Sequence, residues 1–429
     1  MKILCCGDVH IGRRSSRLPA HVDGRLVSCG ACWERVVDCA LAERVDVVAL
    51  SGDVIDRENR YYEAIGPLEA GLERLADAGI VTVGVAGNHD HDVLPRVAEA
   101  LGPERLRLLG LGGRWERTTI RRGDEAVEVV GWSFPDAVVR SSPLGSLEFE
   151  RGELPVLGLL HADLDQPVSD YAPVSLAELR TAPVDFWLLG HVHAPRLDEA
   201  GAPPILYPGS PQAMDPGEPG VHGVWLLELG RGRAVRLRQV PLSTVRYDSL
   251  ELDVDGVADA GEFDRRVTAA VRDHLARVAE NAGSLRYLSL RLRITGRTPL
   301  HRSLESRVAL LRQDLELENG EVTAVVERVE LETRPARDLE ELARGADPVG
   351  VLARLLLSLD RDGHAAGATQ EDVTELLREA ARVVNAVYEA KSYLSLPREE
   401  VDTAAVAARV LARQASLLLD ELLARKEGA

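Results

Sequence analysis

Five short clusters of polar residues contain the side-chain types that bind hard or borderline divalent metal ions. They read Gly7-Asp8-Val9-His10, Gly52-Asp53, Gly87-Asn88-His89-Asp90, His161 and Gly190-His191-Val192-His193. Imidazole, carboxylate and amide oxygen together suit manganese, iron or zinc better than calcium. Because the clusters contain no thiolate, a structural zinc cage explains them poorly.

The spacing within two clusters favours a shared site. Asp8 and His10 are two residues apart, as are His191 and His193, so in an extended segment each pair projects to one side. One carboxylate can bridge two ions about 3.5–4 Å apart, and Asp53 is the natural bridge. Two ions held in this way lower the pKa of a bound water and clamp phosphate oxygens. The pattern therefore predicts phosphate-ester hydrolysis.

Each cluster has a simpler explanation when it is taken alone. A lone Gly-Asp or Gly-Asn-His sequence is usually a turn, and a lone His161 would be a partly buried histidine with satisfied hydrogen bonds. However, five of the eleven histidines fall within the clusters, in one order along the chain. Their joint occurrence favours the metal site.

Short, largely β-branched apolar runs precede the clusters. The runs cover residues 3–6, 45–50, 81–85, 156–160 and 186–189. Such runs are typical of buried strands, and their alternation with helical patterns, such as residues 63–76, predicts a layered α/β domain. Binding sites in α/β sheets form beyond the carboxyl ends of strands, which is where the clusters lie.

The pattern changes along the rest of the chain. From about Val245, strand-like and helical segments predict a small α+β unit, and the remainder is helical. We therefore expect domains at residues 1–242, 243–335 and 336–429. A glycine-rich linker is expected at 363–367 and a helix break near Pro397. The last helix has an apolar face of Val406, Val410, Leu411, Leu417, Leu418 and Leu422.

Composition excludes several classes of protein. The 429 residues are 45% apolar and 28% charged, close to globular averages, and no run approaches the roughly 18 apolar residues of a membrane span. The N-terminus lacks an export signal, and five cysteines are an odd number, so we expect a cytoplasmic protein without disulfides. Cys29 and Cys32 are better explained by core packing along one helical stripe than by zinc or redox chemistry.

The balance of charge bears on nucleic-acid binding. With 51 basic and 69 acidic residues, the net charge of -18 argues against a protein that coats nucleic acid by bulk charge. Local binding remains open because metal ions can neutralise an acidic site. Two arginine groups, at 13, 14 and 17 and at 231, 233, 236 and 238, are more simply solvated surface than binding sites.

Taken together, the clusters resemble the five signatures of calcineurin-like metallophosphoesterases. The matching segments are Asp8-Val-His10, Gly52-Asp-Val-Ile-Asp56, Gly87-Asn-His-Asp90, His161 and Gly190-His-Val-His193. Tyr207-Pro-Gly-Ser-Pro211, Gly296-Arg-Thr-Pro-Leu300 and Asp347-Pro-Val-Gly-Val-Leu352 are similar to segments of the SbcD and YhaO group of DNA repair nucleases. The resemblance implies a β-sandwich flanked by helices, an α+β capping domain and a C-terminal helical region.

The resemblance also implies roles for individual residues. One ion would be bound by Asp8, His10, Asp53 and His193, and the other by Asp53, Asn88, His161 and His191. His89 would orient the scissile phosphate or protonate the leaving oxygen. Asp90 would accept a hydrogen bond from the His89 ring, with a turn cap as its alternative. Some relatives have a second non-ligand histidine shortly after the bridging aspartate, and residues 54–59 contain none.

The expected function is two-metal hydrolysis of DNA phosphodiesters by an exonuclease or endonuclease. Manganese is the favoured metal, with iron and zinc as alternatives. Expected partners are DNA, a second copy of the chain and an SMC-like ATPase of the SbcC or YhaN type. The ATPase would bind the C-terminal helices, although these helices could equally pack against their own chain. Two alternatives stay open: a phosphodiesterase for small or cyclic nucleotides, and a catalytically silent scaffold for such an ATPase.

Overall fold

The structure is a computed structural model that describes residues 1–57, 64–229, 235–360, 370–388 and 403–427. It has two compact units, one of residues 1–296 and 302–333 and the other of residues 297–301 and 334–429. The boundaries expected at 242 and 335 stay predictions. The expected linker at 363–367, the break at Pro397 and Arg231 and Arg233 lie outside the described residues.

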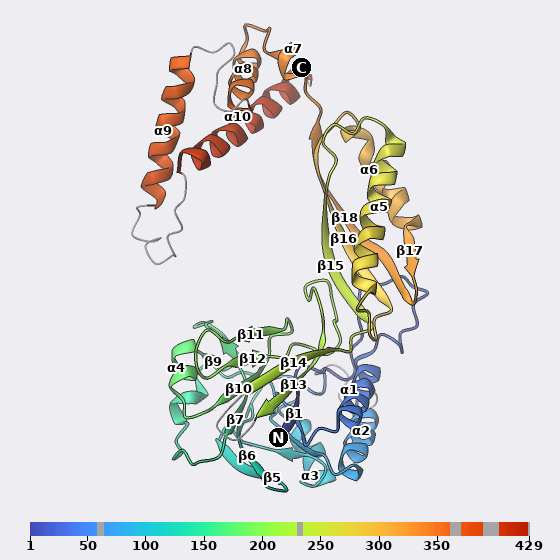
Figure 1. The fold of residues 1–429 in the computed structure, drawn as a ribbon, viewed down its shortest axis with the longest axis vertical. Coiled ribbons are helices and arrows are strands. Elements are labelled where there is room, and N and C mark those ends of the chain that lie inside the picture. The colour runs from blue at the N-terminus through green and yellow to red at the C-terminus, as the bar shows by residue number, and fades with distance from the viewer. Residues whose placement is uncertain (58–63, 230–234, 361–369, 389–402, 428–429) are drawn as a thin grey trace. The chain divides into compact units, whose positions relative to one another are not determined.

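Two six-stranded sheets form the first part of the chain (Figure 1). The first has the order β14 (Val235–Pro241), β13 (Gly223–Leu229), β1 (Lys2–Cys6), β2 (Val47–Leu50), β3 (Val81–Gly84), β4 (Arg107–Leu108). The second has the order β11 (Arg196–Asp198), β12 (Ile205–Tyr207), β10 (Phe186–Gly190), β7 (Val156–His161), β6 (Glu125–Trp132), β5 (Glu116–Arg122). Strands β1, β2 and β3 are parallel, as are β6, β7 and β10.

Alternating side chains join the sheets and cover them. Ile3 and Val47 of the first sheet pack against Leu157 and Phe186 of the second in one buried cluster. On the outer faces lie α1 (Cys29–Glu43), α2 (Ile65–Asp77) and α3 (Leu94–Leu101) on one side and α4 (Leu176–Thr181) on the other. The expected layered α/β sandwich flanked by helices is confirmed. The short elements η1 (Pro143–Ser146), β8 (Asp163–Leu164) and β9 (Pro173–Val174) add apolar residues to the cluster on the outer face of the second sheet.

Helix α1 begins where the sequence supplies a cap. The Ser28 side chain accepts a hydrogen bond from the Ala31 amide, which satisfies one of the free N–H groups of the first turn. Cys29 and Cys32 are buried on the inner face of the helix, so the core-packing interpretation is confirmed. All five cysteines are free.

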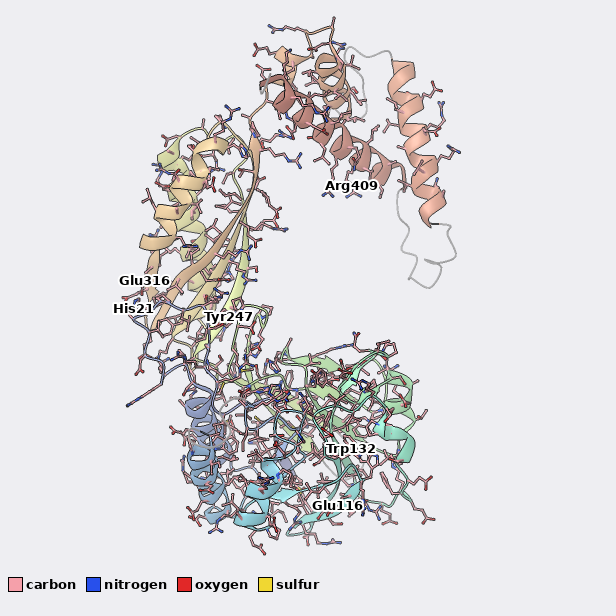
Figure 2. The ribbon with its side chains drawn as sticks, turned by 180° about the vertical axis from the view of Figure 1, so that it is seen from behind. His21, Glu116, Trp132, Tyr247, Glu316 and Arg409 are labelled. Carbon is pink, nitrogen blue, oxygen red and sulfur yellow. The ribbon has the colours of Figure 1, made fainter. Side chains whose placement is uncertain are left out.

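A smaller, four-stranded sheet follows the two sheets of the sandwich. Its order is β15 (Val245–Asp253), β16 (Tyr287–Thr298), β18 (Val322–Pro335), β17 (Glu316–Asn319). Helices α5 (Ala260–Ala279) and α6 (Leu304–Asp314), with the short η2 (His301–Ser303), complete the α+β unit. The contacts between this unit and the loop after β1 include a hydrogen bond from Tyr247 Oη to the carbonyl of Ser16 at 2.5 Å and an approach of His21 Nε2 to Glu316 Oε1 at 3.4 Å (Figure 2).

The C-terminal unit is helical. It contains α7 (Leu339–Leu342), α8 (Pro348–Asp360), α9 (Gln370–Tyr388) and α10 (Thr403–Glu427). The face expected for the last helix is wrong in part, because Val410, Leu417 and Leu418 are exposed. Leu422, which was expected, packs against α8, and so do Ala415 and Leu419, which were not expected. None of the described helices is long and apolar enough to cross a membrane.

Packing of α1 on α2 depends on a glycine. A Cβ at Gly71 would lie 2.8 Å from Trp33 Cε2 and 3.0 Å from Val37 Cγ2. Alanine is the better helix former by about 1 kcal/mol, but overpacking a core costs about 1–3 kcal/mol. We expect Gly71→Ala to lower the urea midpoint, measured by circular dichroism. Gly66→Ala, in the same helix with open space around it, should leave or raise the midpoint. A Gly71→Ala protein as stable as the wild type would contradict this packing.

Candidate metal centre

The centre is built at the carboxyl ends of parallel strands in both sheets. Asp8 and His10 follow β1, Asp53 follows β2, Asn88 follows β3, His161 ends β7 and His191 follows β10. Asp8, His10, Asp53 and His191 all have positive φ angles, of 51°, 49°, 51° and 102°. Such angles cost L-residues about 1–3 kcal/mol each and persist only where surrounding contacts hold them. The backbone therefore bends sharply at these residues as it leaves the strands.

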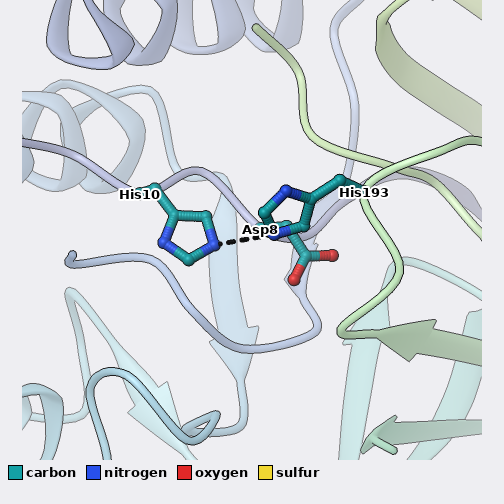
Figure 3. Close-up of side chains that lie close together, drawn as sticks. All are labelled: Asp8, His10 and His193. Carbon is teal, nitrogen blue, oxygen red and sulfur yellow. Dashed lines mark hydrogen bonds between the residues drawn. The ribbon is translucent and has the colours of Figure 1, made fainter. Parts of the chain in front are cut away.

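The first group of donors is Asp8, His10 and His193. One ligand atom from each lies within 4.8 Å of the others. His10 Nε2 and His193 Nε2 are only 3.1 Å apart, with the Asp8 carboxylate beside them (Figure 3). Asp8 and His10 follow β1 and His193 follows β10, so loops from the two sheets meet here.

The second group of donors shares Asp53. Asp8, Asp53 and His161 offer ligand atoms within 4.8 Å of one another, and so do His10, Asp53 and His89. His161 Nε2 is 3.4 Å from Asp53 Oδ2 and 3.0 Å from Asn88 Oδ1. Asp53 therefore lies between the donors expected for the two ions, where a bridging carboxylate is required.

His191 lies next to this second group. Its ring is 5.3 Å from the His161 ring and 4.8 Å from the Tyr171 ring. Its Nε2 is 3.9 Å from Asp163 Oδ2. Among the described residues, His191 belongs to none of the tight three-donor groups, so its role as a ligand stays a prediction.

The donors fit divalent cations. Asp8, His10, Asp53 and His161 are almost completely buried. Burying carboxylates together is costly unless a cation or hydrogen bonds offset their charge. His10 Nε2 and His193 Nε2 face each other at 3.1 Å. Two such nitrogen lone pairs are better satisfied by one cation that both bind than by direct contact with each other. Nitrogen and oxygen donors without thiolate match manganese, iron or zinc.

Three of the histidines are oriented by an oxygen behind the ring. His10 Nδ1 lies 3.2 Å from Asp56 Oδ1, and His161 Nδ1 lies 3.0 Å from the Ser51 carbonyl oxygen. His193 Nδ1 lies 2.6 Å from Glu218 Oε1. These contacts favour the proton on Nδ1 and leave the lone pair of Nε2 directed into the centre. Asp56 was part of a motif without an assigned role, and no sequence signal marked Glu218.

Burial and charge shift the pKa values of the carboxyl groups in opposite directions. Burial raises the pKa of Asp8 to about 6. Burial would also raise the pKa of Asp53, but the imidazoles of His161 and His10 outweigh it, so that pKa is lowered. Asp53 therefore stays ionised over a wide pH range and can share its oxygens, as a bridge requires.

His89 and Asp90 differ in their surroundings. The His89 ring meets the His10 ring edge-on at 4.7 Å, and its Nδ1 is 3.5 Å from Asp56 Oδ1. The buried Asp90 accepts from the backbone amides of Val54, Ile55 and Gly87 at 2.7, 3.3 and 2.8 Å. The expected hydrogen bond between Asp90 and His89 is thus not observed. Asp90 caps the loops after β2 and β3, because three amides converge on it, and Asp56 is the carboxylate beside His89.

Comparison with known proteins agrees with this geometry. Residues 1–195 match the calcineurin-like phosphoesterase family, and residues 247–334 match the middle domain of the metallophosphoesterase YhaO. The chain therefore contains a calcineurin-like phosphoesterase domain followed by a YhaO-type middle domain, and the expected resemblance is confirmed. Both matched families are described as phosphoesterases, which is the class of enzyme that the donors of the metal centre also fit.

Individual relatives are distant. The chain is 27% identical over 220 residues to the "Uncharacterized metallophosphoesterase YhaO" of Bacillus subtilis. The aligned region covers 51% of this chain and 54% of that protein. The chain is also 27% identical over 292 residues to the "DNA double-strand break repair protein Mre11" of Aeropyrum pernix, covering 65% and 69%. A solved dimetal phosphatase from Danio rerio aligns at 15% identity with a TM-score of 0.35, covering 56% and 98%. The chain thus spans about half the length of the YhaO relative.

The Glu218 carboxylate should support metal binding through His193. We expect Glu218→Ala to weaken Mn²⁺ binding about 10- to 100-fold in calorimetric titration, because the His193 ring loses its orientation. Glu218→Gln, which keeps an acceptor, should recover part of the affinity. Glu228→Gln, at an exposed carboxylate on β13, is the matched control. Unchanged Mn²⁺ affinity in Glu218→Ala, with the metal-free thermal midpoint preserved, would rule out this role.

Metal binding should also depend on pH. With a pKa of about 6, Asp8 carries a proton in the metal-free protein below pH 6, and the metal must displace it. Although burial opposes it, Glu218 raises the pKa of His193, which adds a second competing proton. We expect Mn²⁺ affinity to fall as pH drops from 7.5 to 5, about tenfold or more per pH unit below 6. An affinity that is constant over this range would contradict the assignment.

Proposed function

We propose that the protein is a two-metal nuclease that hydrolyses DNA phosphodiesters. The observation that carries the proposal is the group of buried carboxylate and imidazole donors around Asp53, with a partly exposed His89 at its edge. This arrangement provides both parts of the chemistry. Buried donors hold cations, and an accessible histidine can exchange a proton with the substrate.

The proposed ligands follow the two groups around Asp53. Asp8, His10, Asp53 and His193 would hold one ion, and Asp53, Asn88, His161 and His191 the other. When bound, two divalent cations would supply charge to offset the phosphate and acidify a water. Manganese is the proposed metal, with iron and zinc as alternatives that the same donors accept.

His89 is the proposed catalytic histidine. Burial lowers its pKa, but the carboxylates of Asp56 and Asp53 outweigh burial and raise it above the usual value. The raised pKa favours the protonated form of His89 more than that of a free histidine. With 33% of its side chain exposed, it can donate that proton to a leaving oxygen.

DNA is the proposed substrate because two independent features point to it. The relative from Aeropyrum pernix is named as a DNA double-strand break repair protein. The middle unit of β15–β18, α5 and α6 lies beyond the phosphoesterase domain, and a small substrate would not require it. The net charge of -18 favours the alternative, a phosphodiesterase for small or cyclic nucleotides.

Partners and location belong to the same proposal. Exposed apolar residues on α9 and α10, including Leu376, Val383 and Val410, are consistent with an SMC-like ATPase or a second copy of the chain as a partner. Cytoplasmic location is supported by the five free cysteines.

A digest of end-labelled single- and double-stranded DNA with Mn²⁺ tests the proposal. The wild type should cleave DNA. His89→Ala should keep metal binding but cleave about 10²- to 10⁴-fold more slowly, because a proton donor is removed. Asp53→Ala should lose at least one ion by elemental analysis. Glu228→Gln, at the exposed carboxylate on β13, serves as the control.

Three outcomes would contradict the proposal in different ways. Turnover of bis(p-nitrophenyl) phosphate without DNA cleavage would favour the small-substrate alternative. A protein that binds no divalent ions would favour the silent scaffold. Metal loss in His89→Ala together with full metal in Asp53→Ala would reverse the assigned roles.

A further inference from the structure

A cavity opens beside the metal centre and is lined by arginines. Its volume is about 870 Å³, and its lining includes Arg13, Arg14, Arg25, Ser28, Gly30 and Asp56. An adjoining cavity of about 400 Å³ shares Arg14 and adds Arg17. Because Asp56 also contacts His10 and stands beside His89, the larger cavity borders the site where a scissile phosphate would lie.

The arginines of this cavity differ from others in the chain. Among the residues that the structure describes, Arg13, Arg14, Arg17 and Arg25 form no ion pair with a carboxylate. By contrast, Arg238 pairs with Glu43 at 2.8 Å and Arg236 lies 3.9 Å from Glu228, as expected for a solvated surface. In so acidic a chain, arginines without a carboxylate partner around one cavity leave a local excess of positive charge.

Two acidic residues also line the cavity. Asp56 is directed toward His10 and His89, and Glu34 is exposed on α1. The first turn of α1, which contributes Gly30 and Ala31 to the lining, contains no acidic residue. Its N-terminal partial charge therefore adds to the positive potential of the arginines.

We propose that this cavity binds backbone phosphates of the nucleic-acid strand next to the scissile phosphodiester. The inference rests on the proposed nuclease function and names where its substrate is held. Guanidinium groups bind phosphate oxygens through paired hydrogen bonds, and arginine without a carboxylate partner is available for this interaction. A small phosphodiester has no neighbouring phosphate to place here. The cavity therefore selects polynucleotides over small diesters.

The double variant Arg13→Gln/Arg14→Gln tests the cavity. Its KM for a single-stranded oligonucleotide should rise about tenfold or more at moderate salt, while kcat changes little. The slope of log affinity against log salt should decrease by about 0.7 for each phosphate that the variant no longer neutralises. Turnover of bis(p-nitrophenyl) phosphate should stay at the wild-type rate, which also shows that the fold and metal centre are intact. Arg25→Gln alone should give a smaller change in the same direction.

The matched control is Arg121→Gln/Arg122→Gln, which removes two exposed arginines from β5. These residues pair with Ala126 and Glu125 at the start of β6, whereas the end of β6 pairs with β7 near His161. They thus lie at the opposite end of the sheet from the metal centre. Wild-type KM and salt slope are expected for this control.

Two results separate the inference from the proposed function. If the wild type cleaves DNA and the Arg13→Gln/Arg14→Gln and Arg25→Gln proteins show its KM and salt slope, the cavity is not a phosphate subsite. If the wild type hydrolyses the small diester but neither binds nor cleaves DNA, the nuclease function itself is overturned.

Discussion

The structure depends on one electrostatic constraint: two carboxylates and two imidazoles are buried within a few ångströms of one another between two sheets, with a third, partly exposed imidazole beside them. Asp8, Asp53, His10 and His161 are almost fully shielded from solvent, and His193 closes the group. Removing each carboxylate charge from water costs several kcal/mol unless a partner compensates it. Divalent cations would provide that compensation. The left-handed backbone at Asp8, His10 and Asp53 brings the donors together at a further conformational cost.

Oxygen atoms around the centre orient the rings of its histidines. Asp56, Ser51 and Glu218 each contact the Nδ1 atom of one histidine, so the opposite nitrogens face inward. Glu218 is itself fixed by Met214 N and Ser210 Oγ. Its loop continues into a contact with β15, where Gly220 N donates to the Tyr247 carbonyl at 2.9 Å. The middle unit is therefore connected by this hydrogen bond to a loop that orients a candidate ligand.

Much of this arrangement could be predicted from the sequence because short-range patterns determine it. Buried strands read as apolar runs, and the residues that follow them meet at one edge of the sheets. Asp8, His10, Asp53, Asn88, His161 and His193 were all placed near one another for that reason. Glu218 could not be found because it reaches His193 from a loop 25 residues later, and only tertiary folding brings them together.

Other predictions failed for equally physical reasons. Of the two roles expected for Asp90, the hydrogen bond from its sequence neighbour His89 is not observed, because three converging backbone amides occupy its oxygens, and the alternative role as a turn cap is the one observed. The face of α10 was read from apolar residues alone. Helix packing instead uses a stripe that includes the small Ala415, which leaves Leu417 and Leu418 exposed.

Anomalous diffraction from crystals grown with Mn²⁺ tests the central claim most directly. The account predicts two peaks about 3.5–4 Å apart on either side of the Asp53 carboxylate, one beside His10 and His193 and the other beside His161 and Asn88. A single peak, or peaks at any other group of side chains, would contradict it.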